Sequence, residues 1–280
     1  MNAIEIKGLT KSYKDFTLDN LNLTLPAGCI MGLVGENGAG KTTTIRMLLG
    51  LTKPDSGTAT VLGQPIGKDM RTVKQDIGVV LDEVGLPTCL TAKQAGKVMA
   101  AAYKNWDMAL YERYLKDLAI PDNKAFSELS RGNKMKLGIA AAMSHNAKLL
   151  ILDEPTSGLD PVVRDEVVDL FAEFTRDPGH GVLISSHIVS DLEKLCDYIA
   201  FLHKGKLLLC EEKDRLLEEY GLIQCDRATL DDLASGAVLG RRENPYGVQA
   251  LVRRDAIPAG MDVRPVTIEE LFVFMVKEDR

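Results

Sequence analysis

A glycine-rich segment near the N-terminus constrains this chain more than any other feature of its sequence. In order, it reads Gly35, Glu36, Asn37, Gly38, Ala39, Gly40, Lys41 and Thr42. A short apolar run at residues 29–34 precedes it and suits a buried parallel strand. Apolar residues at helical spacing follow at residues 42–49. A glycine-rich turn between a strand and a helix start predicts a phosphate-binding P-loop.

The residue types of this segment suit the phosphates of a nucleoside triphosphate. Glycines adopt backbone conformations that other residues avoid, so backbone N–H groups can approach phosphate oxygens closely. The start of the helix adds partial positive charge. We expect Lys41 to reach the β- and γ-phosphates, and the Thr42 hydroxyl to coordinate Mg²⁺.

A second strand supplies the acidic residues that such a site needs. The apolar run at residues 147–152 ends in Asp153 and Glu154. An aspartate at the carboxyl end of a strand beside a P-loop holds Mg²⁺, usually through water. Glu154 is then placed to activate the attacking water as a general base. Acidic pairs also occur on solvated surfaces, but Pro155 and the turn at residues 157–160 follow directly and favour the catalytic interpretation.

With these motifs in this order, the chain resembles the nucleotide-binding subunits of ATP-binding cassette (ABC) transporters. The resemblance extends from about residue 3 to about residue 210. It implies that Tyr13 stacks on adenine and that residues 129–133 form the signature segment. It also implies that Asp160 is the D-loop aspartate and that His187, after a strand at residues 182–186, contacts the γ-phosphate. Tyr13 as an ordinary strand residue and His187 as a structural histidine are the alternatives.

The resemblance assigns the site residues one by one. It implies ATP contacts by Tyr13, Gly35, Asn37, Gly38, Gly40, Lys41, Thr42, Thr43, Asp82, Ser130, Gly132 and Asp160. It implies Mg²⁺ coordination by Thr42, Asp82 and Asp153. It implies catalysis by Glu154 together with His187.

Members of this family pair head to tail, and the signature of one subunit covers the γ-phosphate on the P-loop of the other. Ser130 and the N–H groups at Gly132 would start a helix at residues 133–143, so that a helix N-terminus faces phosphate. A site divided between two chains makes closure depend on the γ-phosphate, and hydrolysis then releases it.

The signature segment departs from the family pattern. It reads Leu-Ser-Arg-Gly-Asn, whereas the family has Leu-Ser-Gly-Gly-Gln. Arginine tolerates positive φ poorly, so we expect position 131 not to need it. The charge of Arg131 either helps to hold phosphate across the dimer or faces solvent, and the sequence leaves both open.

A second departure follows the predicted strand at residues 77–81. The family has a glutamine there, which binds Mg²⁺ and signals to the membrane partner, but this chain has Asp82 and Glu83. Register favours Asp82 in that role, with Glu83 as the alternative. Aspartate coordinates Mg²⁺ well but adds negative charge, so ATP affinity should depend more strongly on Mg²⁺. Neither departure removes the catalytic groups, and we expect an active ATPase.

Composition excludes several other classes of protein. The net charge of −6 argues against a broad nucleic-acid surface, and no apolar run approaches the ~18–20 residues of a membrane span. The first residues start a strand and do not resemble a signal peptide. Five scattered cysteines without a CxxC pattern indicate a reducing compartment. With the resemblance, this predicts a peripheral protein on the cytoplasmic face of the cell membrane.

The order of elements predicts an α/β fold with a three-layer P-loop NTPase core. Residues 4–27 alternate like two antiparallel strands, which predicts an N-terminal antiparallel β subdomain. Core strands are expected at residues 30–34, 77–81, 149–152, 182–185 and 198–203. Helices are expected at residues 91–103, 108–118 and 132–143, within a helical subdomain at about residues 85–145. We therefore divide the chain into an ABC ATPase domain at residues 1–210 and a small C-terminal extension at residues 211–280.

Residues 211–220 read as a charged helix and residues 221–264 as a small α/β appendage. Thr267 and Glu270 form a capping-box pattern before a final apolar helix. This ending resembles bacterial exporters of the ABC-2 type. We expect the helix to fold back on the core of its own chain, with dimer support or regulation as the alternative.

The resemblance implies an ATP-binding and ATP-hydrolysing subunit whose dimerisation powers export through a separate polytopic membrane subunit. Its partner cassette is a second copy or a homologous subunit. Residues 82–106, including Trp106, are the expected contact with the membrane subunit, although Trp106 also suits plain core packing. The alternatives are a soluble ABC-type ATPase acting on ribosomes or DNA, or a weakly active partner in a heterodimer. The single cassette and the lack of a heptad array disfavour the soluble class. The transported substrate is not specified, because the membrane subunit selects it.

Overall fold

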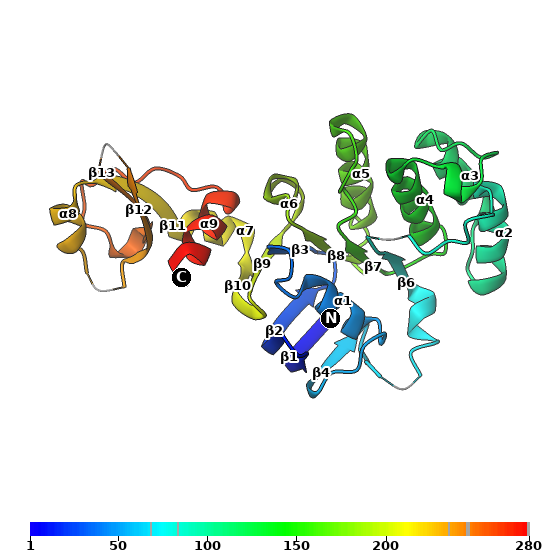
Figure 1. Ribbon diagram of the computed structural model, residues 1–280, viewed down its shortest axis with the longest axis horizontal. Coiled ribbons are helices and arrows are strands. Elements are labelled where there is room, and N and C mark those ends of the chain that lie inside the picture. Colours follow the sequence, from blue (N-terminus) through cyan, green and yellow to red (C-terminus); the bar gives the residue numbers. More distant parts are fainter. Residues whose placement is uncertain (68, 83, 235, 245–246, 279–280) are drawn as a thin grey trace.

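The computed structural model describes residues 1–67, 69–82, 84–234, 236–244 and 247–278 of the chain. A six-stranded sheet forms its centre, with strand order β10-β9-β3-β8-β7-β6 (Figure 1). Its strands are β3 (Ile30–Gly35), β6 (Ile77–Val80), β7 (Leu149–Asp153), β8 (Gly181–Ser186), β9 (Tyr198–His203) and β10 (Lys206–Glu212). All neighbours are parallel except β9 and β10, so the carboxyl ends of five strands meet at one edge.

A smaller antiparallel sheet has the order β2-β1-β4-β5. Its strands are β1 (Asn2–Ser12), β2 (Thr17–Pro26), β4 (Ser56–Val61) and β5 (Gln64–Pro65). The long hairpin of β1 and β2 agrees with the two antiparallel strands expected at residues 4–27.

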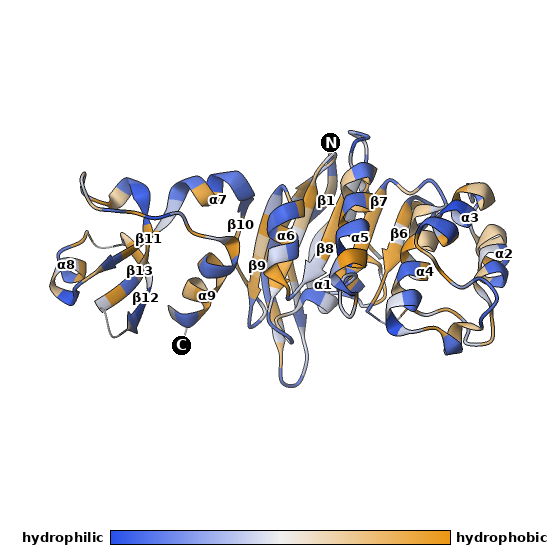
Figure 2. Cartoon of the chain, turned by 90° about the horizontal axis from the view of Figure 1, so that it is seen from above, coloured by the Kyte–Doolittle hydropathy of each residue, from blue (hydrophilic) through white to orange (hydrophobic). Residues whose placement is uncertain are grey.

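The central sheet is covered on both faces. Met31 and Leu33 of β3 belong to the apolar cluster shared with the antiparallel sheet and α1 (Lys41–Leu48), whereas Ile30 and Val34 belong to the cluster on the opposite face. That opposite face packs against α4 (Arg131–Met143), α5 (Pro161–Phe174) and α6 (Val189–Leu195) (Figure 2). Burial on both faces explains why the strands are almost continuously apolar.

A group of helices lies beyond β6, at the opposite end of the molecule from the C-terminal segment (Figure 1). It contains α2 (Ala92–Ala102), α3 (Met108–Asp117), a 3₁₀ turn at Phe126–Glu128 and α4. Tyr111 is fully buried there and donates its hydroxyl to the Ala92 carbonyl at 2.8 Å. Trp106 packs into this core, with its ring centroid 5.0 Å from that of Tyr111. Core packing therefore explains the position of the Trp106 ring, and a contact between Trp106 and a membrane subunit stays a prediction.

The C-terminal segment forms a three-stranded sheet of order β11-β13-β12 with helices around it. Its elements are α7 (Lys213–Glu219), β11 (Tyr220–Cys225), α8 (Arg227–Asp231), β12 (Val238–Asn244), β13 (Gly247–Arg253) and α9 (Ile268–Glu278). The helix expected at residues 211–220 begins only at Lys213, because β10 continues pairing with β9 as far as Glu212.

The last helix folds back onto the core of its own chain, as its sequence predicts. The Thr267 hydroxyl accepts from the Glu270 N–H at 3.1 Å, and the Glu270 carboxylate accepts from the Thr267 N–H at 3.0 Å, which is the expected capping box. The Phe272 ring of α9 lies 5.2 Å from that of Phe201 in β9. Its apolar residues thus extend the core on the α5–α6 face of the central sheet.

Candidate active site

The glycine-rich segment forms a tight loop between the end of β3 and the start of α1. Gly38 and Gly40 have φ values of +81° and +114°, a region that favours glycine. A Cβ atom at Gly40 would lie 2.8 Å from the Leu18 side chain and 2.9 Å from that of Leu202. Glycine is therefore required at position 40 for its backbone conformation and also for close packing.

This loop borders a cavity of about 490 Å³, which we call the P-loop cavity. Its lining comprises Asp15, Phe16, Glu36, Asn37, Gly38, Ala39, Gly40, Lys41, Thr42, Thr43, Asp82 and Glu154. Phe16 was not singled out from the sequence. Tyr13 is about half exposed, at 48%, and its ring stacks on Phe16 with centroids 6.5 Å apart. An aromatic pair therefore lies beside the loop, where the sequence indicated one aromatic residue.

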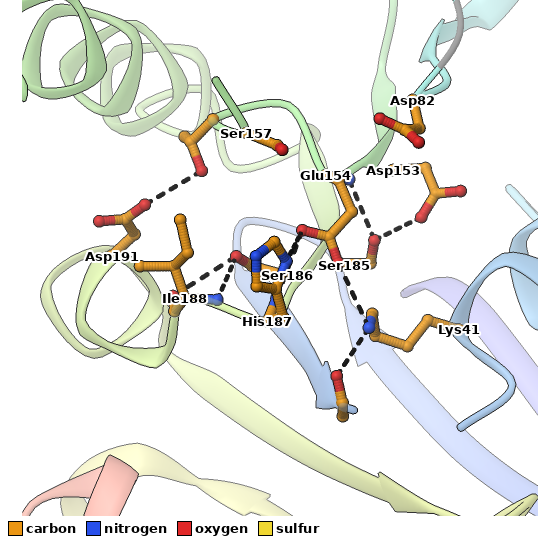
Figure 3. Close-up of polar contacts among 12 residues, drawn as sticks. Lys41, Asp82, Asp153, Glu154, Ser157, Ser185, Ser186, His187, Ile188 and Asp191 are labelled. Carbon is orange, nitrogen blue, oxygen red and sulfur yellow. Dashed lines mark hydrogen bonds and ion pairs between the residues drawn. The ribbon is translucent and has the colours of Figure 1, made fainter. Parts of the chain in front are cut away.

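Lys41 is the buried cation of the site, with 6% of its surface exposed. Its Nζ donates to the Gly35 carbonyl at 2.7 Å and to the Glu36 carbonyl at 3.4 Å. The same Nζ lies 3.3 Å from Oε1 of Glu154 (Figure 3). The ammonium group is thus held at the loop by backbone oxygens and by the carboxylate of Glu154, the residue directly after β7.

Thr42 and Asp153 meet at the carboxyl edge of the central sheet although they lie far apart in sequence. The Thr42 hydroxyl donates to Asp153 Oδ2 at 2.8 Å, and the Ser185 hydroxyl of β8 donates to Oδ1 at 2.6 Å. Asp153 is only 2% exposed, so these two bonds fix its carboxylate. The polar end of the buried strand at residues 181–186 was the available signal for Ser185.

Glu154 has an unusual backbone, with φ of +53°. Its N–H donates to both the carbonyl and the hydroxyl of Ser185, at 3.2 and 3.1 Å. Such a conformation is uncommon for a residue other than glycine and persists where surrounding contacts determine it. It turns the carboxylate toward Lys41 on one side and His187 on the other (Figure 3).

His187 follows β8, and its Nδ1 lies 2.6 Å from Glu154 Oε2. The His187 N–H also donates to this oxygen, at 3.3 Å. The other oxygen, Oε1, is buried and accepts no hydrogen bond within the described part of the chain. One carboxylate oxygen is therefore held by His187, while the other faces the Lys41 ammonium at 3.3 Å as an ion pair without a hydrogen bond.

Asp82 lines the P-loop cavity but is already paired. Arg131 donates to Asp82 Oδ1 at 2.7 Å and to the Ser157 hydroxyl at 3.3 Å. Arg131 is the first residue of α4 and has no positive φ, as expected for arginine. Its side chain is 61% exposed, but its guanidinium makes a specific contact within its own chain. Glu83, the alternative to Asp82, lies outside the described residues.

Ser130 and Asp160 act as helix caps. The Ser130 hydroxyl accepts from the Asn133 N–H at 3.2 Å, and Asp160 Oδ1 accepts from the Val163 N–H at 3.1 Å. The helix expected from Gly132 or Asn133 thus begins one or two residues earlier, because Ser130 is the cap. As far as the chain is described, the lining of the P-loop cavity does not include Ser130, Gly132 or Asp160.

A buried cluster that the sequence did not indicate links the turn after Glu154 to α6. The Thr156 hydroxyl donates to Asp191 Oδ2 at 3.0 Å, and Arg164 Nη1 lies 3.6 Å from Oδ1. Glu154 directly follows β7 and His187 directly follows β8, and the chain continues from each of them into this cluster. It fixes the two segments relative to each other.

The oxygen donors of this edge suit Mg²⁺. Thr42 and Asp153 offer a hydroxyl and a carboxylate, the hard ligands that Mg²⁺ prefers. Within the described residues, no three His, Cys, Asp or Glu side chains are gathered so as to hold a metal by themselves. Mg²⁺ commonly binds through one or two protein ligands plus substrate phosphates, so this donor set fits that ion when a nucleotide is bound.

Comparison with known proteins finds similar sequences and a similar fold. The sequence profile of the family described as "ABC transporter" matches residues 18–157. The bacitracin transport ATP-binding protein BcrA of Bacillus licheniformis is 39% identical over 210 residues, covering 73% of this chain and 68% of that protein. The uncharacterized ABC transporter ATP-binding protein YhcH of Bacillus subtilis (strain 168) is 36% identical over 284 residues, covering 98% and 91%.

A solved structure described as the ATP binding subunit of an ABC transporter superposes with a TM-score of 0.69 at 28% identity, covering 76% of this chain and 91% of that one. Within the described residues, no helix is both long and apolar enough to cross a membrane.

Proposed function

Because this chain belongs to the ABC transporter family as an ATP-binding subunit with ATPase activity, we propose that it pairs head to tail on ATP and Mg²⁺ and drives export through a separate membrane subunit. One observation carries the proposal for the site. Lys41, Glu154 and His187 form a row of contacts beside the Thr42–Asp153 pair, all at the carboxyl edge of one sheet.

The P-loop holds the triphosphate. Its backbone N–H groups and the start of α1 attract phosphate oxygens. Lys41 exchanges its carbonyl partners for the β- and γ-phosphates, which offer a stronger, charge-assisted contact. The adenine lies against the aromatic pair of Tyr13 and Phe16.

Thr42, Asp82 and Asp153 would hold Mg²⁺, with Asp153 acting through water. When bound, the ion neutralises charge on the β- and γ-phosphates. The Thr42–Asp153 hydrogen bond and the Ser185 contact support this role, because they hold the Thr42 hydroxyl and the Asp153 carboxylate together at the sheet edge.

Glu154 is the general base. Its Oε1 has acceptor capacity for a water molecule, while His187 holds Oε2. Before nucleotide binds, Lys41 partly neutralises this carboxylate. Once phosphates engage Lys41, the carboxylate is free to take the proton of the attacking water, and the His187 ring contacts the γ-phosphate.

The second cassette completes the site. Ser130 and Gly132 stand at the N-terminus of α4, where unpaired N–H groups and the helix dipole favour an anion. This end covers the γ-phosphate bound to the partner's P-loop, with Asp160 in the contact between the two cassettes. ATP is thereby shared, and dimerisation reports the presence of the γ-phosphate.

The membrane partner is a polytopic permease that selects the substrate, and residues 82–106 of this chain form the contact with it. The chain then acts at the cytoplasmic face of the cell membrane. The direction of transport is outward, in keeping with the resemblance of the chain's ending to ABC-2 exporters.

Replacement of the base tests the catalytic assignment. We expect Glu154→Gln to lower steady-state phosphate release at least about 100-fold, the lower range for loss of a general base. ATP and Mg²⁺ should then accumulate a dimer that size-exclusion chromatography with light scattering detects. Glu112→Gln, which makes the same change on an exposed site in α3, is the matched control and should behave like the wild type. Undiminished phosphate release by Glu154→Gln would contradict the assignment.

Capture from membranes tests the partner. The tagged Glu154→Gln chain, loaded with ATP and Mg²⁺, is recovered from detergent-solubilised native membranes and its partners are identified by mass spectrometry. A polytopic membrane protein supports the transporter function. Recovery of ribosomal or DNA-repair proteins alone would replace it with the soluble class of ABC ATPase. Uptake by inside-out vesicles that contain the recovered complex then tests the direction of transport.

A further inference from the structure

Two residues at which this chain departs from the family pattern contact each other. Arg131 stands where the pattern has a glycine, and Asp82 where it has a glutamine. Their side chains form an ion pair with 2.7 Å between nitrogen and oxygen, although the residues are 49 positions apart. The two departures from the family pattern therefore belong to one ion pair.

The position of Asp82 gives this pair its significance. Asp82 lines the P-loop cavity together with Lys41 and Thr42, and it also lines an adjoining cavity of about 410 Å³. Arg131 lines only the adjoining cavity. The carboxylate thus lies in the wall between the two spaces, with the phosphate site on one side and the guanidinium on the other.

Arg131 is directed to Asp82 by its surroundings. It begins α4 directly after the Ser130 cap, and its guanidinium also donates to the Ser157 hydroxyl at 3.3 Å. A Cβ atom at Gly158 would lie 3.3 Å from Arg131 Cδ, so glycine there leaves room for the side chain. Three segments that border the site converge on this one side chain.

The charges of the P-loop cavity explain what the pair does. Among the described residues that line the cavity, four carry carboxylates, namely Asp15, Glu36, Asp82 and Glu154, against one lysine, Lys41, and no arginine. Lys41 faces Glu154. ATP without a metal is highly anionic, so an unscreened carboxylate at position 82 repels it, whereas Mg²⁺ turns the same carboxylate into an attractive group.

We propose that Arg131 is a positioning residue that sets, through Asp82, how strongly nucleotide binding depends on Mg²⁺. Arg131 screens the carboxylate while no metal is present and yields it to the metal of an incoming Mg²⁺–nucleotide. Both partners are more than half exposed, at 61% and 53%, and an exposed pair is weak enough for this exchange. This inference rests on the proposed function, in which the P-loop cavity binds ATP with Mg²⁺.

A linkage follows from the exchange. If Mg²⁺–nucleotide draws Asp82 away from Arg131, then the start of α4 loses its ion pair with Asp82. Ser130 and Gly132, which contact the second cassette in the proposed dimer, lie at this start. The effect is reciprocal, since fixing Arg131 elsewhere must strengthen binding of the metal–nucleotide by the same factor. Loading of the site and readiness of the signature segment are coupled by one ion pair.

The test measures binding rather than turnover. The affinity of the full-length chain for a fluorescent, non-hydrolysable ATP analogue is determined in 5 mM EDTA and again at about 5 mM free Mg²⁺. The quantity compared between variants is the dissociation constant in EDTA divided by the dissociation constant in Mg²⁺. Arg131→Gln should weaken metal-free binding about two- to fivefold without weakening Mg²⁺-dependent binding, so the ratio rises. Asp82→Asn should tighten metal-free binding and lower the ratio.

The double variant and a control distinguish an effect of Arg131 through Asp82 from a general effect of positive charge near the cavity. Asp82→Asn with Arg131→Gln should give the same ratio as Asp82→Asn alone, because Arg131 acts only through Asp82. Lys134→Gln removes a neighbouring cation of α4 that lines the same adjoining cavity, and it should leave the ratio unchanged.

Equal weakening under both conditions by Arg131→Gln, or additive effects in the double variant, would overturn the inference. The proposed function fails separately. Absence of analogue binding by the wild type, or insensitivity of binding to Lys41→Ala, would refute the nucleotide site itself.

Discussion

The turn between β9 and β10 offers a sharp test of how the fold supports the P-loop. Lys204 and Gly205 connect the two strands with φ values of +45° and +80°, as a two-residue type I′ turn requires. The Gly205 N–H donates to the Ala39 carbonyl inside the P-loop at 3.0 Å, and its carbonyl accepts from the Asp19 N–H at 2.8 Å. A Cβ atom at position 205 would overlap the Thr17 carbonyl oxygen.

The β4–β5 turn provides a matched control. Leu62 and Gly63 have φ values of +50° and +76°, nearly the same backbone, but a Cβ at Gly63 would meet only the end of the exposed Met1 side chain, at 3.5 Å. Alanine at Gly63 therefore costs only the left-handed strain of about 1–2 kcal/mol, less about 0.4–1 kcal/mol from the reduced entropy of the unfolded chain.

At Gly205 two further costs are added. Relief of the overlap costs about 1–3 kcal/mol, and weakening of the two backbone hydrogen bonds costs about 1 kcal/mol each. We expect Gly205→Ala to lower the free energy of unfolding about 3–5 kcal/mol more than Gly63→Ala does. It should also weaken binding of an ATP analogue, because the Ala39 carbonyl loses its support.

Urea unfolding followed by circular dichroism measures this difference, with equal slopes required for the comparison. Nucleotide affinity is measured at a temperature at which both variants are folded. Equal destabilisation by the two alanines would refute the argument from the overlap. A normal nucleotide affinity of Gly205→Ala would refute the supporting role of the turn.

Three further predictions concern single side chains. Burial lowers the pKa of His145, so the unfolded chain takes up a proton near pH 6.5 that the folded chain resists, and stability falls as pH drops below that value. For one proton, the free energy of unfolding changes by at most about 1.4 kcal/mol per pH unit. Urea unfolding between pH 5 and 8 should show a weaker pH dependence for His145→Gln than for the wild type. An unchanged pH dependence would exclude His145 as its source. Asp191→Ala leaves Thr156 and Arg164 without their partner and should cost about 2–4 kcal/mol, whereas Asp191→Asn keeps the Thr156 contact and should cost clearly less; equal losses in urea unfolding would argue against the hydrogen bond. Thr91→Ala removes the capping box of α2 and should cost about 1 kcal/mol in the same assay, with Thr91→Ser near wild type, and a neutral alanine variant would show that the cap does not contribute.

Local sequence determined a large part of this protein. The P-loop, the acidic strand end and the final capping box could be predicted because each depends on residues close together in the chain. Glycine conformation, strand and helix periodicity and caps are set within a few residues of each other, so their signals survive in the bare sequence. The three-layer α/β class follows from the same alternation of elements.

The tertiary structure decided which of these local elements face one another. Strand order β3-β8-β7 brings Ser185 beside Asp153 and sets His187 against Glu154, and no periodicity specifies that order. The Arg131–Asp82 pair likewise arises only because α4 packs against β6, and from the sequence Arg131 had two other interpretations. Contacts between distant segments depend on how whole faces pack, whereas the sequence by itself records only what each segment prefers. That difference is why the chemistry of each motif could be predicted, while the partners that hold and tune it could not.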